Sequence, residues 1–310
     1  MSPIKKLLFS LLIGLFFSSV CSFWLSNGLN KYYTELHKKL KSTFVDSTNY
    51  DLLFVGSSRV MNNVNPKIID SITTLKSFNA GTSGANVYES KVIIESYLEN
   101  HPAPKSIYVG LDLFSFNTKN KLFNYTYYLP FTENKKLVSE LNLLDHNTTL
   151  YKYLPFLQLA DYDDYAKTNA IKGILSKKEL IQNQTEYKGF VSLGNEVLDT
   201  SNLIIGGETV VIDLVGENTL NEILLLCKKR NIKLSFFYAP EYKAMWQKKV
   251  TNAQFVFSMI DSFSQKNNIA FLRYDTIQIC NNPLYFNNVR HLNNEGANMF
   301  SEIFAKDIKQ

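Results

Sequence analysis

The chain has 310 residues, of which 45% are hydrophobic and 20% charged, and its formal net charge at pH 7 is +5. This apolar content is enough for a core and excludes a chain that is disordered throughout. Three cysteines without a C-x-x-C spacing, and only four histidines, exclude a disulfide framework and a zinc knuckle. No stretch combines clustered Lys and Arg with aromatic residues, so we expect no nucleic-acid partner, and nothing points to a metal or cofactor.

The first predicted element is an apolar helix. Lys5 and Lys6 precede an uncharged run from Leu7 to Leu25, which has the length of a helix that spans a bilayer. Cationic residues before such a run place the N-terminus in the cytoplasm and the rest of the chain outside. Trp24 stands where an aromatic residue would anchor the helix at the interface. We therefore expect residues 1–27 to form an uncleaved signal anchor.

Two other interpretations of this segment stay open. A cleaved signal peptide needs small residues before the cleavage point, a rule that Ser19, Cys21 and Ser22 meet in part, and a buried core helix is the third interpretation. Either export interpretation puts the body of the chain outside the cytoplasmic membrane. The signal anchor predicts a single-pass protein of that membrane whose body faces the periplasm or the cell exterior. Residues 28–49, with a helix expected at Asn30–Phe44, would form a solvated, basic juxtamembrane stalk.

The remaining residues, 50–310, show the rhythm of an α/β domain. Short apolar runs predict strands at 51–55, 78–81, 106–111, 233–238 and 269–274. Helical spacing of apolar residues predicts helices at 66–72, 87–99, 218–230, 252–266 and 294–308. This alternation predicts right-handed crossovers and a three-layer sandwich around a central parallel sheet. Residues 117–216 lack the rhythm and are expected to form an insertion.

Three residues in the predicted domain are suited to acyl transfer. Ser58 follows the first strand, Gly84 follows the second, and His291 precedes the last helix. Sites in parallel α/β sheets lie beyond the carboxyl ends of the strands, so these residues are expected at one edge. There, His291 would take the hydroxyl proton of Ser58, and the backbone N–H groups of Ser58 and Gly84 would face a developing oxyanion.

In this order the motifs resemble the SGNH/GDSL hydrolase superfamily, across residues 50–116 and 219–308. The resemblance implies a flavodoxin-like fold in which Ser58 is the nucleophile, Gly84 the oxyanion glycine and His291 the base. Two positions depart from the family pattern: Asp112 stands where the oxyanion Asn is expected, and Asn288 stands where the D-x-x-H acid is expected. A carboxylate would repel an oxyanion, and an amide stabilises an imidazolium less well than a carboxylate does.

The G-S-S start at Gly56 and the anchored, exported layout are most similar to the envelope branch of this superfamily, which contains D-alanyl-transfer and polysaccharide O-acetyl-transfer proteins. The resemblance implies an envelope glycan or an acyl-carrying molecule as substrate and a membrane-bound O-acyltransferase as partner. Arg59 is a candidate for holding an anionic substrate. Because of Asp112 and Asn288, a non-catalytic binding or assembly component of a polysaccharide-modification system is the competing hypothesis.

Overall fold

The computed structural model describes residues 2–32, 34–119, 121–144, 148–151, 153–154, 157–175, 186–201 and 206–309. The chain divides into two compact units. The sheet unit comprises residues 46–124 and 183–310, and the helical unit comprises residues 1–45 and 125–182. The expected insertion, 117–216, is thus shared between them, because its residues 125–182 belong with the N-terminal segment. Part of that insertion lies outside the described residues.

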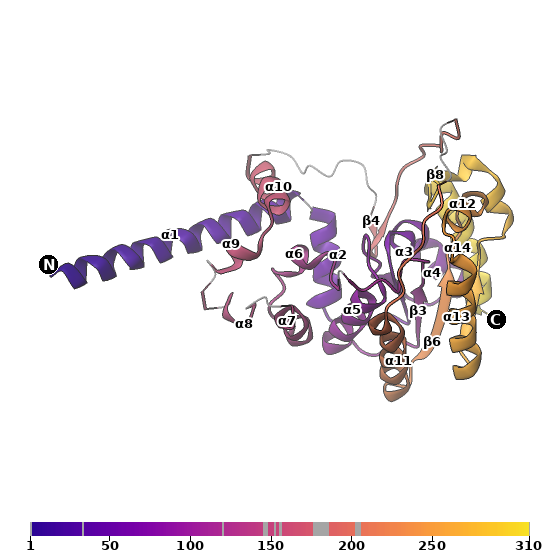
Figure 1. Ribbon diagram of the computed structural model, residues 1–310, viewed down its shortest axis with the longest axis horizontal. Coiled ribbons are helices and arrows are strands. Elements are labelled where there is room, and N and C mark those ends of the chain that lie inside the picture. Colours follow the sequence, from indigo (N-terminus) through magenta and orange to yellow (C-terminus); the bar gives the residue numbers. More distant parts are fainter. Residues whose placement is uncertain are drawn as a thin grey trace. The chain divides into compact units, whose positions relative to one another are not determined.

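The sheet unit is built on five parallel strands, which confirms the predicted α/β fold (Figure 1). The strands are β1 (Leu52–Val55), β2 (Ser77–Asn79), β3 (Ser106–Gly110), β6 (Lys233–Tyr238) and β7 (Ala270–Arg273). Their order in the sheet is β2-β1-β3-β6-β7, with Leu53 paired to Phe78 on one side and to Ile107 on the other. The first strand therefore lies between the second and the third, so the loops after β2 and β3 flank the loop after β1.

Helices connect these strands. Those of the sheet unit are α3 (Ser58–Asn63), α4 (Pro66–Thr73), α5 (Val87–Asn100), α11 (Leu214–Lys229), α12 (Met245–Lys249), α13 (Ala253–Asn267) and α14 (Asn294–Lys309), with short 3-10 turns at Tyr242–Ala244, Gln278–Asn281 and Pro283–Tyr285. The five predicted strands correspond to the five strands of the sheet, and the five predicted helices correspond to α4, α5, α11, α13 and α14. The short helix α3 was not predicted, because six residues are too few to show a periodic apolar pattern.

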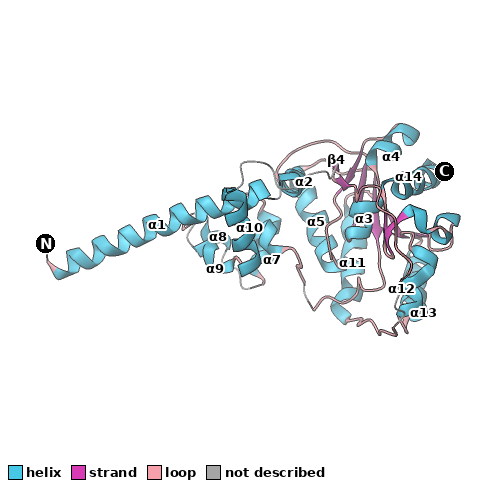
Figure 2. Ribbon diagram, turned by 90° about the horizontal axis from the view of Figure 1, so that it is seen from above, coloured by secondary structure: helices cyan, strands magenta, loops and turns pink. Residues whose placement is uncertain are grey.

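The two faces of the sheet are covered by different helices, which gives the three layers. Side chains alternate along a strand, so neighbouring residues of β6 point to opposite faces. Phe236 packs against Phe263 of α13, whereas Phe237 packs against Phe304 of α14 with 4.7 Å between ring centroids. Helices α5 and α11 lie side by side, and α11 contacts β6, while α14 contacts α3 and α4 (Figure 2).

Two small antiparallel pairs complete the sheet unit. They are β4 (Glu186–Tyr187) with β5 (Phe190–Val191), and β8 (Phe286–Asn288) with β9 (His291–Leu292). The second pair closes a tight turn in which Asn288 lies opposite His291. This turn holds the last candidate motif of the sequence just before α14 begins.

In its described residues, the helical unit contains seven helices. Their bounds are α1 (Pro3–Tyr32), α2 (Thr34–Phe44), α6 (Tyr125–Tyr128), α7 (Lys135–Asn142), α8 (Thr148–Tyr151), α9 (Gln158–Asp161) and α10 (Asp164–Leu175). Among the described residues, α1 is the one helix long and apolar enough to cross a membrane. Most of its apolar side chains are exposed, which fits a signal anchor or a signal peptide better than a core helix.

Helix α2 is packed rather than solvated, in contrast to the expected stalk. Its Leu40 and Phe44 are buried, and the Phe44 ring contacts Tyr128 and Phe131 at centroid distances of 5.3 and 5.6 Å. A further aromatic contact stacks His37 on Phe131. The apolar residues spaced along this basic segment therefore serve as the packing face of a helical bundle, which the count of charges alone did not indicate.

Candidate active site

Ser58 is placed by the abrupt end of β1. Gly56 has φ 150°, and a Cβ atom there would lie 2.7 Å from the carbonyl oxygen of Gly110 on β3. Only glycine fits this approach, so β1 turns directly into α3. Ser57 is the N-cap of α3 and accepts the Arg59 N–H through its Oγ at 3.1 Å. Ser58 therefore opens the helix, where its own N–H has no acceptor within the helix.

His291 contacts Ser58 although it lies 233 residues later in the chain. The Oγ of Ser58 and the Nε2 of His291 lie 2.8 Å apart, which is hydrogen-bond distance for a nucleophile and its base. The approach is fixed next to the histidine, because the Leu292 N–H donates to Oδ1 of Asn63 on α3 at 3.0 Å. The turn that carries the histidine is thus tied to the helix that carries the serine.

Asn288 contacts the other ring nitrogen of His291. Its Oδ1 lies 2.9 Å from Nδ1 of the ring and also accepts the backbone N–H groups of Arg290 and His291 at 3.1 and 3.2 Å. The amide nitrogen of Asn288 donates to Oδ1 of Asn287, which fixes the orientation of the amide. With the oxygen facing the ring, Nδ1 carries the proton and Nε2 is left as the acceptor that faces Ser58.

The imidazole of His291 stays neutral over a wide pH range. Burial lowers the pKa of His291 to about 4, and the positive charges of Arg59 and Arg290 act in the same direction while Asp112 opposes them. A neutral ring is the form that can take a proton from a serine. No carboxylate contacts the ring among the contacts that the structure describes, so an imidazolium formed during reaction would be stabilised chiefly by the amide oxygen of Asn288.

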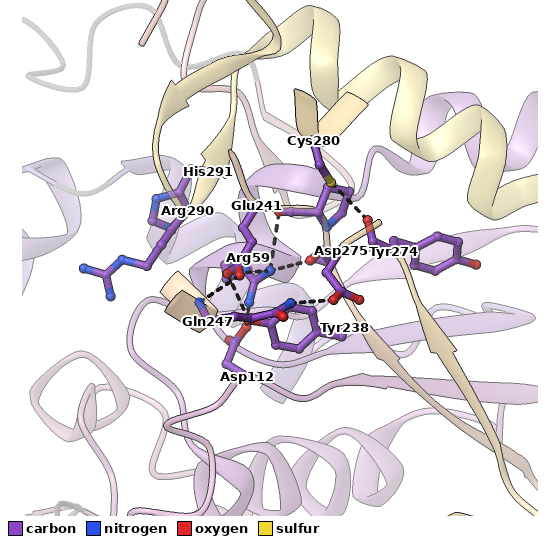
Figure 3. A network of polar contacts seen from close by, with 12 residues as sticks. Arg59, Asp112, Tyr238, Glu241, Gln247, Tyr274, Asp275, Cys280, Arg290 and His291 are labelled. Atoms are coloured by element: carbon purple, nitrogen blue, oxygen red, sulfur yellow. Dashed lines mark hydrogen bonds and ion pairs between the residues drawn. The ribbon is translucent and has the colours of Figure 1, made fainter. Parts of the chain in front are cut away.

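Beneath the reactive residues lies a buried network of charges (Figure 3). Arg59 is 2% exposed, and its Nη1 donates to Oδ1 of Asp112 at 2.5 Å, while Nη2 donates to the carbonyl oxygen of Ala239. Its guanidinium lies 4.2 Å from the ring centroid of Tyr238 and 3.8 Å from Oε2 of Glu241. Burial alone would lower the pKa of Arg59, but these neighbours together raise it, so the guanidinium is firmly charged.

This network gives Arg59 and Asp112 positions that differ from those expected at the sequence level. Asp112 is 3% exposed and accepts hydrogen bonds from Arg59 and from the Ser57 hydroxyl. The two charges form an ion pair with each other in the interior. With 2% and 3% of their surfaces exposed, neither the Arg59 guanidinium nor the Asp112 carboxylate is open to a substrate in this structure. Ser58 and Arg59 are consecutive residues of the first turn of α3, so their side chains leave the helix axis about 100° apart and face different surroundings.

Gly84 lies in the loop after β2, on the same edge of the sheet. The loop is tied to the end of β1, because the Thr82 N–H donates to the carbonyl oxygen of Gly56 at 2.9 Å. Gly84 has φ 69°, which favours glycine, and a Cβ there would lie 2.8 Å from the ring of Phe123. The structure gives no direct contact between Gly84 and Ser58, so the oxyanion role of its N–H remains a proposal.

Two further carboxyl groups follow strands of the sheet, Asp275 after β7 and Glu241 after β6. Asp275 accepts from Gln247 and Arg273, and Glu241 accepts the Tyr238 hydroxyl at 2.9 Å. Burial raises the pKa of Glu241 although Arg59 opposes the shift. Cys227 and Cys280 are both buried free thiols.

Sequence reasoning missed the residues that support the site. Ser57, Tyr238 and Gln247 are examples, and Asn63 is another. For Ser57 a signal existed, since a serine directly before a short helix is a preferred N-cap. The others come from distant segments, and nothing in their local pattern marks them. In the described part of the chain, no three His, Cys, Asp or Glu side chains are grouped as metal ligands would be.

Comparisons with known proteins add similar folds. No protein-family model matches the chain, and no curated protein sequence matches it. One similar solved structure, from Desulfitobacterium hafniense DCB-2, is provisionally described as a lipolytic protein of the G-D-S-L family; it has 8% identity, covers 84% of this chain and 99% of its own, and gives a TM-score of 0.42. A second, provisionally described as an acylhydrolase from Bacteroides fragilis NCTC 9343, has 12% identity, covers 90% and 96%, and scores 0.40. At these values, what the site can do follows from its own geometry.

Proposed function

We propose that the chain is a serine-dependent acyl esterase or acyltransferase whose reactive residues are Ser58, His291 and Asn288. The observation that carries the proposal is the continuous line of contacts from Ser58 Oγ to His291 Nε2 at 2.8 Å and from His291 Nδ1 to Asn288 Oδ1 at 2.9 Å. Nucleophile, base and orienting group are the three parts that acyl transfer through a serine requires.

In the first step, Ser58 Oγ attacks the carbonyl carbon of the acyl donor while its proton moves to His291 Nε2. The carbonyl oxygen becomes an oxyanion, for which the N–H groups of Ser58 and Gly84 are the proposed donors. The intermediate then collapses: the bond to the leaving alcohol breaks, and His291 returns the proton to that alcohol. The product of this step is an ester of the acyl group on Ser58.

In the second step, water or an acceptor hydroxyl attacks this ester, and His291 again takes the proton. The bond between the acyl carbon and Ser58 Oγ then breaks, and His291 returns the proton to Ser58. Water gives hydrolysis, whereas a sugar hydroxyl gives acyl transfer. The layout of the chain favours an envelope glycan as the partner of the reaction, because an apolar helix precedes the sheet unit and suits an anchor in the cytoplasmic membrane with the body outside. A membrane-bound O-acyltransferase that delivers acyl groups is part of the proposal on the resemblance alone.

The second candidate function is a non-catalytic binding component with the same fold. It is favoured by Asn288, because an amide in place of a carboxylate leaves the imidazolium without a negative charge beside it. In a serine-protease template, the Asp-to-Asn change lowers kcat about 10⁴-fold. The hydrogen bond between Asn288 Oδ1 and His291 Nδ1 argues against this candidate, since it still holds the productive tautomer.

A serine-reactive fluorophosphonate distinguishes the two functions. Full-length protein in detergent should be labelled covalently at Ser58, and Ser58→Ala and His291→Ala should not be labelled. The matched control is Ser115→Ala, which removes another buried hydroxyl of the sheet unit, one that accepts the Asp112 N–H, and should leave labelling in place. If wild type and Ser58→Ala are labelled equally, or neither reacts, the nucleophile is not Ser58 and the binding component is preferred.

A further inference from the structure

A hollow lies in the sheet unit among the segments that follow β2 and β3. Its volume is about 310 Å³, at the small end of the range for ligand pockets. It is lined by Gly84, Asn86, Phe114, Asn117, Lys119 and Phe123. These residues come from the segments that follow β2 and β3, the two strands on either side of β1. Because Ser58 follows β1, which lies between β2 and β3, the hollow and the nucleophile share one edge of the sheet.

Phe123 is the unusual member of this lining, because 57% of its surface is exposed. Its backbone is nevertheless held firmly. The Phe123 N–H donates to Oε2 of Glu89 at 3.0 Å, and the following Asn124 donates through Nδ2 to Oε1 of Glu89 at 2.9 Å and to the carbonyl oxygen of Ser83 at 2.7 Å. Glu89 is fully buried, and burying a carboxylate is costly unless its hydrogen bonds are satisfied.

Gly84 provides the seat for the Phe123 ring. A Cβ atom at Gly84 would lie 2.8, 3.0 and 3.2 Å from three carbons of that ring, so no other residue allows the ring to lie there. A buried carboxylate and a glycine turn thus combine to present an exposed aromatic ring in one orientation. An exposed apolar side chain that packing holds in place is typical of a binding surface rather than of a core.

The lining indicates what would bind. Phe114 and Phe123 contribute apolar rings to the lining, Asn117 contributes a carboxamide, and Lys119 is an exposed cation. A pyranose ring has an apolar C–H face, hydroxyl groups at its edge and, in a uronic acid, a carboxylate. We propose that the hollow is a subsite for an anionic sugar of the glycan, with Phe123 as its platform and Lys119 as its charge partner. This inference rests on the proposed function and adds the charge of the substrate to it.

The test measures binding and turnover separately on the full-length protein in detergent. Calorimetric titration uses trigalacturonate as the anionic probe and mannotriose as the neutral one. Phe123→Ala should weaken the binding of both sugars about tenfold, as truncation of a central aromatic contact does, and Phe123→Trp should restore it. Lys119→Gln should weaken trigalacturonate alone, and the loss should disappear at high salt, because a rim charge acts through screened electrostatics.

Matched controls are Phe255→Ala and Lys266→Gln, which remove an exposed ring and an exposed cation from α13, away from the hollow. Both should bind like wild type. Turnover of p-nitrophenyl acetate should also be unchanged in these two control variants, because neither position lies near the subsite. Unchanged sugar binding in Phe123→Ala, or no binding by wild type, overturns the inference. Binding that depends on Phe123 without any turnover instead overturns the proposed function.

Discussion

The reactive rim and the interior beneath it use opposite chemistry. The rim consists of neutral groups, a serine, a neutral imidazole and an amide, joined in one line. The interior directly below holds Arg59 with Asp112 and Glu241, a cation with two carboxyl groups that water does not reach. The difference teaches that a residue's neighbour in sequence is a poor guide to its neighbour in space, since Ser58 belongs to the rim and Arg59 to the interior.

The adjacent serines give the largest contrast between the two regions. Ser58→Ala removes the proposed nucleophile, so kcat for p-nitrophenyl acetate should fall by roughly 10⁴–10⁶-fold while stability is kept. Ser57→Ala removes a helix cap and a donor to Asp112, so it should lower the free energy of unfolding by about 1–2 kcal/mol and keep a measurable rate. Steady-state kinetics and denaturant unfolding check both, and the opposite assignment of the two effects would reverse the roles of the serines.

The interior can be broken by removing one charge. Asp112→Ala leaves the buried Arg59 without its closest counter-ion, so the free energy of unfolding should fall by about 3–5 kcal/mol. Asn288→Ala, a truncation at the rim, should be much less destabilising because Asn288 is only partly buried. Both are measured by denaturant unfolding. Equal losses of stability in the two variants would show that the buried ion pair between Arg59 and Asp112 does not stabilise the fold.

Introducing a charge at the rim tests the reverse. Asn288→Asp places a carboxylate beside Nδ1 of His291, and an opposite charge at that distance raises a histidine pKa by about 1–3 units. The acid limb of kcat/KM should move to higher pH by the same amount, and the maximum rate should rise because the imidazolium is better stabilised. The pH profile is the measurement. A profile that does not move would mean that residue 288 does not contact the base during reaction.

The smallest effect is expected in the wild type itself. Because the pKa of His291 is lowered to about 4, kcat/KM should stay level from neutral pH downward and reach half its plateau near pH 4. The folded state binds fewer protons than the unfolded state below the ordinary pKa of 6.5, so the stability from this group is full above pH 6.5 and declines as pH falls toward 4. An acid limb near 6.5 in activity would show an unperturbed base.

Much of the sheet unit was predictable, for a physical reason. A buried parallel strand must be apolar on both faces, so its continuous apolar run, such as 233–238, can be recognised in the sequence. The order of strands and helices then fixes which loops share an edge of the sheet. That argument alone brings Ser58 and His291 to one rim. The N-x-x-H spacing also pointed to Asn288, because a tight turn brings residues three apart side by side.

The interior network was not predictable in the same way. Whether Arg59 points outward or inward depends on Tyr238, Ala239 and Glu241, which are about 180 residues away in the chain. Their local sequence shows only a strand followed by a proline. The short helices of the helical unit escaped prediction for another reason: helices of four residues, such as α6 and α8, make little more than one turn, so the apolar spacing has no room to repeat.

Helix α1 packs against α10, and this contact decides how much of the N-terminal helix can be removed without loss of packing. Gly28 and Gly173 face each other so closely that a Cβ on either would collide with backbone, and Ser22 is already buried. The last turns of α1 therefore end the apolar helix and also pack against α10. Removal of the residues up to about Cys21, by a peptidase or by design, would keep this packing, whereas a cut beyond Gly28 would remove it and expose α10.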